Sequence, residues 1–184
     1  MIIEDGKGRG PSAGVSDENM LLTLSVSASV EHHINHTDGK AFNLLFNATP
    51  ATAGDACFLY VKNSDDIDMI IEGFACKLAA SEYIDVKLND VGTPVGGTGV
   101  TPANLNSGSG INASGTFQNG NSITGLSGGA TVERYYNLSS VASLYRNFEQ
   151  DITLRKNGVF TMYAQTGGVA LAGTLVFNYH SKEG

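Results

Sequence analysis

Residues 57–78 constrain the fold more than any other stretch, because they form the most densely apolar segment of the chain. They read CFLYVKNSDDIDMIIEGFACKL, in which two apolar, β-branched runs flank a polar break at residues 63–66. Asn, Ser and Asp bond to their own backbone and favour turns, so the pattern predicts a β-hairpin at the centre of the core. The large apolar positions of the second run change phase at Glu72 and Gly73, which predicts a β-bulge.

Most of the remaining chain shows the period-2 alternation of half-buried strands. Phe42, Leu44 and Phe46, for example, share one face of their segment. The chain has 23 Gly, no Trp and few charges, which favours an all-β fold with long loops. Besides the two runs within 57–78, the predicted strands are residues 22–34, 41–46, 83–88, 131–138, 151–154, 159–164 and 174–179, with turns at 38–39, 156–158 and 166–168.

These strands predict an all-β protein, a jelly-roll β-sandwich of about eight antiparallel strands. At 184 residues the chain is long enough for one domain with a sizeable core. We assign residues 20–184 to a single sandwich domain and residues 1–19, which lack periodicity, to an extended N-terminal arm.

Two segments are ambiguous. Residues 139–148 carry apolar side chains at helical spacing, so a short helix and an irregular crossover both stay open. Residues 91–130 contain no charged residue and are mostly Gly, Ser, Thr and Asn. We expect one or two short edge strands there, near residues 115–118, among ordered loops; a flexible loop is the alternative. This neutral stretch could also pack against another subunit.

The N-terminal arm is the expected partner-binding element, because an arm without its own core is easiest to explain with a partner. Its DGKGRG stretch superficially resembles a phosphate-binding loop, but it lacks the strand before and the helix after that such a loop needs. The candidate partner-binding residues are Ile3, Glu4, Asp5, Gly6, Gly8, Arg9, Gly10 and Pro11.

The two cysteines, Cys57 and Cys76, both lie in the predicted hairpin. If Lys62 pairs with Ile67, Cys57 sits opposite Glu72, and Cys76 lies roughly 13 Å further along the strand. A disulfide requires Cα atoms within about 7 Å. We therefore expect two reduced, buried thiols, as is typical of a protein made in a reducing cytoplasm.

Two clusters suggest metal ligands, and each has a simpler explanation. His32 and His33 would point to opposite faces of a strand, and only a bend would bring His36 to join one of them, so polar residues at a strand end are preferred to zinc. The second cluster lacks the ligand spacing of a calcium loop and fits a solvated turn; its members are Asp65, Asp66 and Asp68.

No set of residues offers a nucleophile, a base and a group to orient it. Glu149 and Asp151 lie close in sequence to Tyr145 and Arg146, but proximity in sequence does not make a glycosidase pair. We therefore expect a non-enzymatic protein with no cofactor and no metal.

The formal net charge of −7 argues against a protein that coats nucleic acid, since that role needs clustered Lys and Arg. No apolar run approaches the roughly 18 residues of a membrane span, so no membrane partner is expected. The first residues contain no apolar signal region, and we expect no secretory signal.

Several short segments together resemble a known family, and turns and strand edges dominate them. They are Ile3 to Gly6 with Gly8 and Gly10, Val15 to Asn19 with Leu21 and Leu22, His36 to Phe42, Tyr60 to Asp68, Thr101, Pro102 and Asn104 to Asn106 with Gly108 and Ser109, and Asp151, Ile152 and Leu154 with the Lys-Asn-Gly turn. The pattern resembles the small jelly-roll virion structural proteins of tailed bacteriophages, the class that includes capsid decoration (cement) proteins. It covers most of the chain; residues 91–130 match least.

The resemblance implies a protein without a catalytic site that binds the major capsid protein on the capsid exterior, often as a trimer, and stabilises the capsid lattice. It further implies a virion protein assembled in the bacterial host cytoplasm. A tail- or fibre-associated jelly roll is one alternative. A carbohydrate-binding β-sandwich is another, for which Tyr135, Tyr136 and Tyr145 are the candidate platform.

Overall fold

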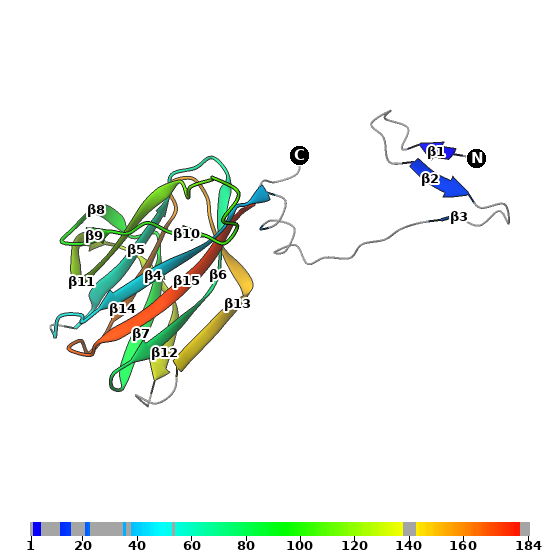
Figure 1. Ribbon diagram of the computed structural model, residues 1–184. Helices are drawn as coiled ribbons and strands as arrows, with labels where there is room; N and C mark the ends of the chain where they lie inside the picture. The colour runs from blue at the N-terminus through cyan, green and yellow to red at the C-terminus, as the bar shows by residue number, and fades with distance from the viewer. Residues whose placement is uncertain are drawn as a thin grey trace.

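The computed structural model describes residues 2–4, 12–15, 21–22, 35, 38–52, 54–137 and 143–180. Two antiparallel sheets pack face to face over a shared apolar core (Figure 1), which confirms the predicted all-β sandwich. The five-stranded sheet runs in the order β10 (Ala103–Asn104), β4 (Ala41–Ala48), β15 (Leu171–His180), β6 (Asp68–Leu78) and β13 (Ser143–Leu154). The seven-stranded sheet runs β12 (Ala130–Asn137), β7 (Glu82–Leu88), β14 (Val159–Ala164), β5 (Ala56–Asn63), β11 (Gly115–Ser127) and β8 (Val91–Val95), with β9 (Thr98–Gly99) pairing to β11.

A third, small sheet takes two strands from the predicted arm and one from the residues just after it. It joins β1 (Ile2–Glu4), β2 (Ser12–Val15) and β3 (Leu21–Leu22), and within the described residues it pairs with neither sandwich sheet. Ile3 and Glu4 therefore lie in a short strand. The remaining candidate partner-binding residues, Asp5, Gly6, Gly8, Arg9, Gly10 and Pro11, lie outside the described residues, as do residues 23–34 of the first predicted strand.

The predicted hairpin within residues 57–78 is wrong. β5 and β6 form as predicted, but β5 belongs to the seven-stranded sheet and β6 to the five-stranded sheet, so the break between them carries the chain across the sandwich. Asn63 explains the difference. Its side-chain amide donates to the carbonyls of Ile67 and Leu154, each at 2.9 Å, which fastens the connection to β13 rather than closing β5 onto β6.

The predicted bulge in β6 is present. β15 pairs Val176 with Gly73 and then Phe177 with Ile71, so Glu72 is an extra residue on β6. The buried positions change phase there as the sequence predicts, from Met69 and Ile71 to Phe74, Cys76 and Leu78. The strand nevertheless stays within one sheet on both sides of the bulge.

Aromatic side chains fill the middle of the sandwich. Phe177 of β15 stacks on Phe42 and on Phe117, with ring centroids 5.5 Å apart in both pairs. Phe117 comes from β11, within the uncharged stretch. The predicted core alternation of β4, β7 and β15 is confirmed by complete burial of Phe42, Leu44, Ile84, Val86, Leu175 and Phe177.

The uncharged residues 91–130 form more strand than their composition predicts. β11 is 13 residues long and is not an edge strand, because it pairs with β5 on one side and with β8 and β9 on the other. β10 joins the edge of the opposite sheet through β4. Backbone hydrogen bonds between strands hold residues 91–130 in place, since few side chains there are buried apart from Phe117 and Ile123. Residues 143–148, left open between helix and crossover, belong to strand β13.

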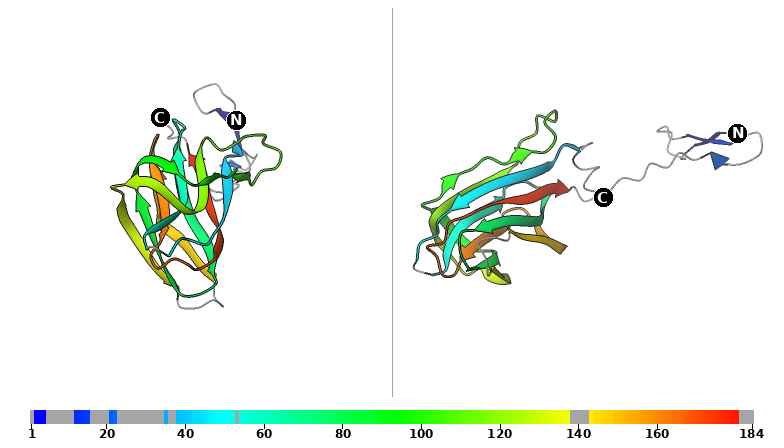
Figure 2. Two further views of the ribbon diagram at one scale, coloured as in Figure 1. Left: turned by 90° about the vertical axis from the view of Figure 1, so that its left-hand side faces the viewer. Right: turned by 60° about the horizontal axis from the view of Figure 1, so that its bottom comes forward.

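Successive long strands alternate between the two sheets in a nested order, except that β7 and β12 are neighbours in the same sheet. Taken in chain order without β11, the eight are β4, β5, β6, β7, β12, β13, β14 and β15. One sheet holds, side by side, the first, eighth, third and sixth of these strands, which are β4, β15, β6 and β13. The other holds the second, seventh, fourth and fifth, which are β5, β14, β7 and β12. β4 begins where β15 ends, since Ala41 pairs with Asn178 (Figure 2).

Candidate functional site

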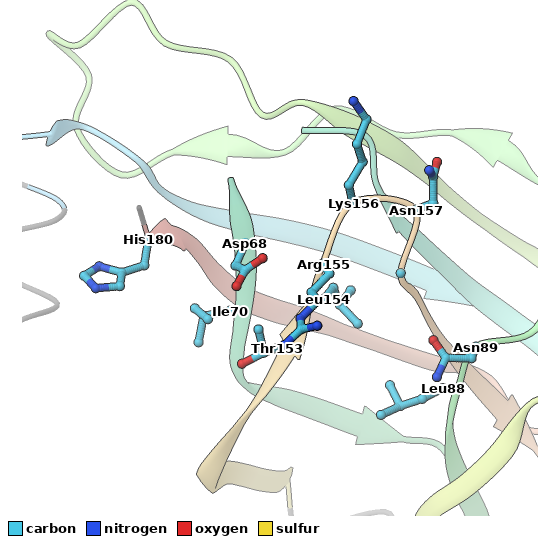
Figure 3. A pocket seen from close by; sticks show the side chains of 11 residues that line it. Asp68, Ile70, Leu88, Asn89, Thr153, Leu154, Arg155, Lys156, Asn157 and His180 are labelled. Atoms are coloured by element: carbon cyan, nitrogen blue, oxygen red, sulfur yellow. The ribbon is translucent and has the colours of Figure 1, made fainter. Parts of the chain in front are cut away.

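A cavity of about 790 Å³ opens at one end of the sandwich, where the two sheets separate (Figure 3). Its walls come from β6, β7, β13 and β15 and from the turn between β13 and β14, in which Asn157 adopts a positive φ of 67°. The lining residues are Asp68, Ile70, Leu88, Asn89, Thr153, Leu154, Arg155, Lys156, Asn157, Gly158 and His180.

The end cavity gathers basic side chains on an acidic protein. Arg155, Lys156 and His180 line it, with Asp68 as the acidic side chain among the lining residues. Lys156 Nζ lies 2.7 Å from Asp66 Oδ1, but both side chains are more than half exposed, so solvent screens the pair and it adds little to stability. Asp66 offsets Lys156 and Asp68 lies among the lining residues, so this end offers basic hydrogen-bond donors without a large net charge.

The chain enters and leaves the sandwich at this same end. His180, the last residue of β15, lies opposite Asp68, the first residue of β6, in the strand register. The Tyr179 amide donates to the Lys40 carbonyl at 3.0 Å. The segment that precedes β4 therefore joins the sandwich beside the basic cavity (Figure 1).

A second cavity, of about 510 Å³, lies on the outer face of the seven-stranded sheet, beneath residues 122–129. Asp90 is buried beside it and accepts hydrogen bonds from Thr161 Oγ1 at 2.6 Å, the Tyr163 hydroxyl at 3.0 Å and the Gly129 amide at 3.0 Å. These three bonds fasten the loop after β11 to β14.

Cys57 lines the second cavity, whereas Cys76 lies in the other sheet. Both are free and buried, which confirms the prediction of reduced, buried thiols. Burial raises the pKa of each thiol to about 12. A thiol that stays protonated at neutral pH is a poor nucleophile, so Cys57 is a packing residue despite its place at the cavity.

The two thiols should therefore resist a disulfide reagent such as DTNB at pH 8 in the folded protein, and both should react after unfolding in urea. Unfolding returns the pKa to the ordinary 9.0. The thiols thus contribute stability that is complete below pH 9 and is lost as the pH rises toward 12. Rapid labelling of either cysteine in the folded protein would contradict this burial.

The acidic turn between β5 and β6 does not assemble a metal site in the residues that the structure describes. Asp65 Oδ1 accepts the Ile67 amide at 3.2 Å, and Asp66 pairs with Lys156. Nowhere in the described ranges do three or more His, Cys, Asp or Glu side chains gather to hold an ion. The predicted His32, His33 and His36 cluster lies outside those ranges.

The predicted tyrosine platform does not form. Tyr135 is buried against Phe74, with ring centroids 5.4 Å apart, and Tyr145 lies exposed on the opposite sheet. Tyr136 instead stacks on Tyr83, with ring centroids 4.1 Å apart. Sequence reasoning missed Tyr83 because the pair depends on the register of β12 against β7, in which these two residues are directly opposite.

Glu149 and Asp151 lie in β13, but their side chains are outside the described part of the structure. The Arg146 guanidinium, on the same strand, lies 4.9 Å from the centre of the Tyr135 ring. In the part of the chain that the structure covers, no helix is long and apolar enough to cross a membrane.

No family model matches the chain, and neither a curated protein nor a solved structure was found to match it.

Proposed function

We propose that this chain is a non-enzymatic virion structural protein that decorates the outer surface of a phage head and stabilises the major capsid lattice. The observation that carries the proposal is that two features lie at one end of the sandwich: the basic cavity and the attachment point of the N-terminal segment. A partner bound there leaves both outer sheet faces uncovered, as suits an outward-facing decoration.

The strand order supports the same assignment. Eight long strands nest in two sheets so that the first lies beside the last and the second beside the seventh. We infer jelly-roll connectivity from this order, since a jelly roll wraps eight strands into two sheets in this way. That fold is the one implied by the family that the sequence resembles.

The small sheet β1–β3 gives a physical reason for a partner. Its strands have three, four and two residues, and a sheet of this size is at best marginally stable alone. Docking onto a capsid protein would bury it. A protein that binds only the assembled shell stabilises that shell by mass action, and a trimer would suit a three-fold position in the lattice.

Cryo-electron microscopy of purified virions that carry the protein tests this function. The expected result is sandwich-shaped density on the outside of the head, with the basic end of the sandwich against the major capsid protein. Density confined to the tail would favour the second candidate, a tail- or fibre-associated structural protein, and would overturn the decoration role.

Deleting residues 1–19 should leave the sandwich folded and weaken its attachment to shells by at least tenfold, because the deletion removes β1 and β2 but no strand of either large sheet. Co-sedimentation with undecorated heads measures the affinity, and circular dichroism checks the fold. A deletion of residues 181–184 is the control and should bind normally. Unchanged binding after the N-terminal deletion would show that the arm is not a contact.

A further inference from the structure

Strand β7 presents a line of polar and aromatic side chains on the outer face of the seven-stranded sheet. Tyr83, Asp85 and Lys87 alternate with Ile84 and Val86, which are buried in the core. At strand rise, the line from Tyr83 to Lys87 spans about 13 Å. β12 and β14 flank it on either side (Figure 1).

The first end of this line is aromatic. Tyr83 and Tyr136 stack with an interplanar angle of 20°, and they are 42% and 46% exposed. Each ring therefore covers one face of its neighbour, while a little under half of each residue stays accessible to solvent. A tyrosine ring offers both an apolar surface and a polar tip for recognition.

An ion pair occupies the middle. Arg134 donates to Asp85 from Nε at 2.5 Å and from Nη2 at 2.6 Å. The Asp85 side chain is 2% exposed and that of Arg134 is 58% exposed. These two contacts use two of the five N–H donors of arginine, so the guanidinium is held in a fixed orientation at the surface.

The second end is the cavity of about 510 Å³. Lys87 Nζ lies 2.7 Å from Asp55 and 4.0 Å from the centre of the Tyr163 ring. Burial opposes ionisation of Asp55, but hydrogen bonds from Lys87 and Gln165 hold its pKa below the ordinary value. Apolar and hydroxyl-bearing side chains share the walls, among them Cys57, Ile123, Leu126, Ser122, Thr124 and Ser127.

We propose that this line, from the Tyr83–Tyr136 stack to the Lys87–Asp55 cavity, binds a short neutral oligosaccharide. Sugar rings offer apolar C–H faces, which pack on aromatic rings, and hydroxyl groups, which pair with fixed donors and acceptors. The cations Arg134 and Lys87 each face a carboxylate. Asp90 adds a further carboxylate at the cavity, so the line has hydrogen-bonding capacity without excess positive charge, which selects a neutral ligand over a phosphorylated or acidic one.

Glycan binding goes beyond attachment to a head and does not depend on it. The line lies on an outer sheet face, whereas the proposed attachment point is the end of the sandwich. A peptide that extended the sheet would pair with the backbone of the edge strand β12 and would not need the tyrosine faces.

Titration of the full chain with cellohexaose, maltohexaose, chitohexaose and mannohexaose, followed by NMR and calorimetry, tests the proposal. At least one should bind with a Kd between about 10 μM and 1 mM. Tyr83→Ala and Tyr136→Ala should each raise the Kd at least tenfold, and the corresponding Phe variants should stay within threefold. Tyr145→Ala is the matched control, since Tyr145 is 71% exposed on the other sheet, and it should leave the Kd unchanged.

The proposal is overturned if none of the four sugars binds at millimolar concentration, or if Tyr145→Ala weakens binding as much as the other two. It is also overturned if binding survives both Tyr83→Ala and Tyr136→Ala. Should an alanine variant fail to fold by circular dichroism, amide shifts of the unmodified protein decide. Shifts on β7 and β12 support the site, and shifts elsewhere exclude it.

Discussion

Replacing Asn63 by alanine should lower the free energy of unfolding by about 3 kcal/mol, since burial without a hydrogen bond costs about 1–3 kcal/mol for each group. Asn63 is fully buried. Besides its bonds to Ile67 and Leu154, its Oδ1 accepts the Asp65 amide at 2.9 Å. Alanine leaves these three backbone groups without that partner. It also removes the side-chain hydrogen bond between the β5–β6 connection and Leu154 of β13.

Urea unfolding followed by circular dichroism measures this loss, because the chain has no Trp for fluorescence. Asn119→Ala is the control. Asn119 also donates from its side-chain amide to a backbone carbonyl, that of Asn47 at 3.0 Å, but this bond is exposed to solvent. We expect the control to lose less than about 1 kcal/mol. Equal losses of stability in the two variants would mean that the buried hydrogen bonds of Asn63 stabilise the fold no more than an exposed one does.

Asn63 also shows where sequence reasoning ends. The period-2 alternation identifies β4, β6, β7, β14 and β15, because each buries one set of alternate side chains against the core. Alternation says which residues face inward and nothing about which strand lies alongside. The polar break after β5 suits a hairpin and a crossing between sheets equally well, and the choice depends on Leu154, which is 91 residues away in the chain.

The strand content of the uncharged residues 91–130 is higher than predicted for a related reason. β11 is held by backbone pairing to β5 from Gly115 to Asn119, and few of its side chains are apolar. The strand also accepts hydrogen bonds from residues far away in the chain: the Thr49 amide donates to Asn121 Oδ1 at 2.8 Å. Composition alone does not reveal such long-range bonds.

The candidate binding line could not be predicted from the sequence, because it depends on the register of β12 against β7. Tyr136 belonged to the predicted platform, but its neighbours in sequence are not its neighbours on the surface. Tyr136 lies opposite Tyr83 because β12 runs antiparallel to β7, with a register shift between Thr131 and Glu133. Without that shift the side chains on β12 would change faces, since strand side chains alternate.

The bulge in β6, by contrast, could be predicted from the sequence, and the glycine beside it is expected to be sensitive to substitution. Gly73→Ala should lower the free energy of unfolding by about 3 kcal/mol, the upper part of the range for overpacking a core. A Cβ at this position would lie 2.2 Å from the Arg146 carbonyl oxygen and 3.0 Å from Asn147 Cα. Both are backbone atoms of the paired strand β13, so no side-chain rotation relieves the clash and one strand must move.

Moving β13 away from β6 would also disturb the core, because Phe148 packs on Phe74 with ring centroids 6.1 Å apart. Gly99→Ala is the matched control: Gly99 also lies in a strand, but a Cβ there meets nothing within 4 Å. The control should change stability by no more than about 0.5 kcal/mol. If Gly73→Ala proves as mild as Gly99→Ala in urea unfolding, β13 can shift freely, and the glycine is not required by close contact between the two strands.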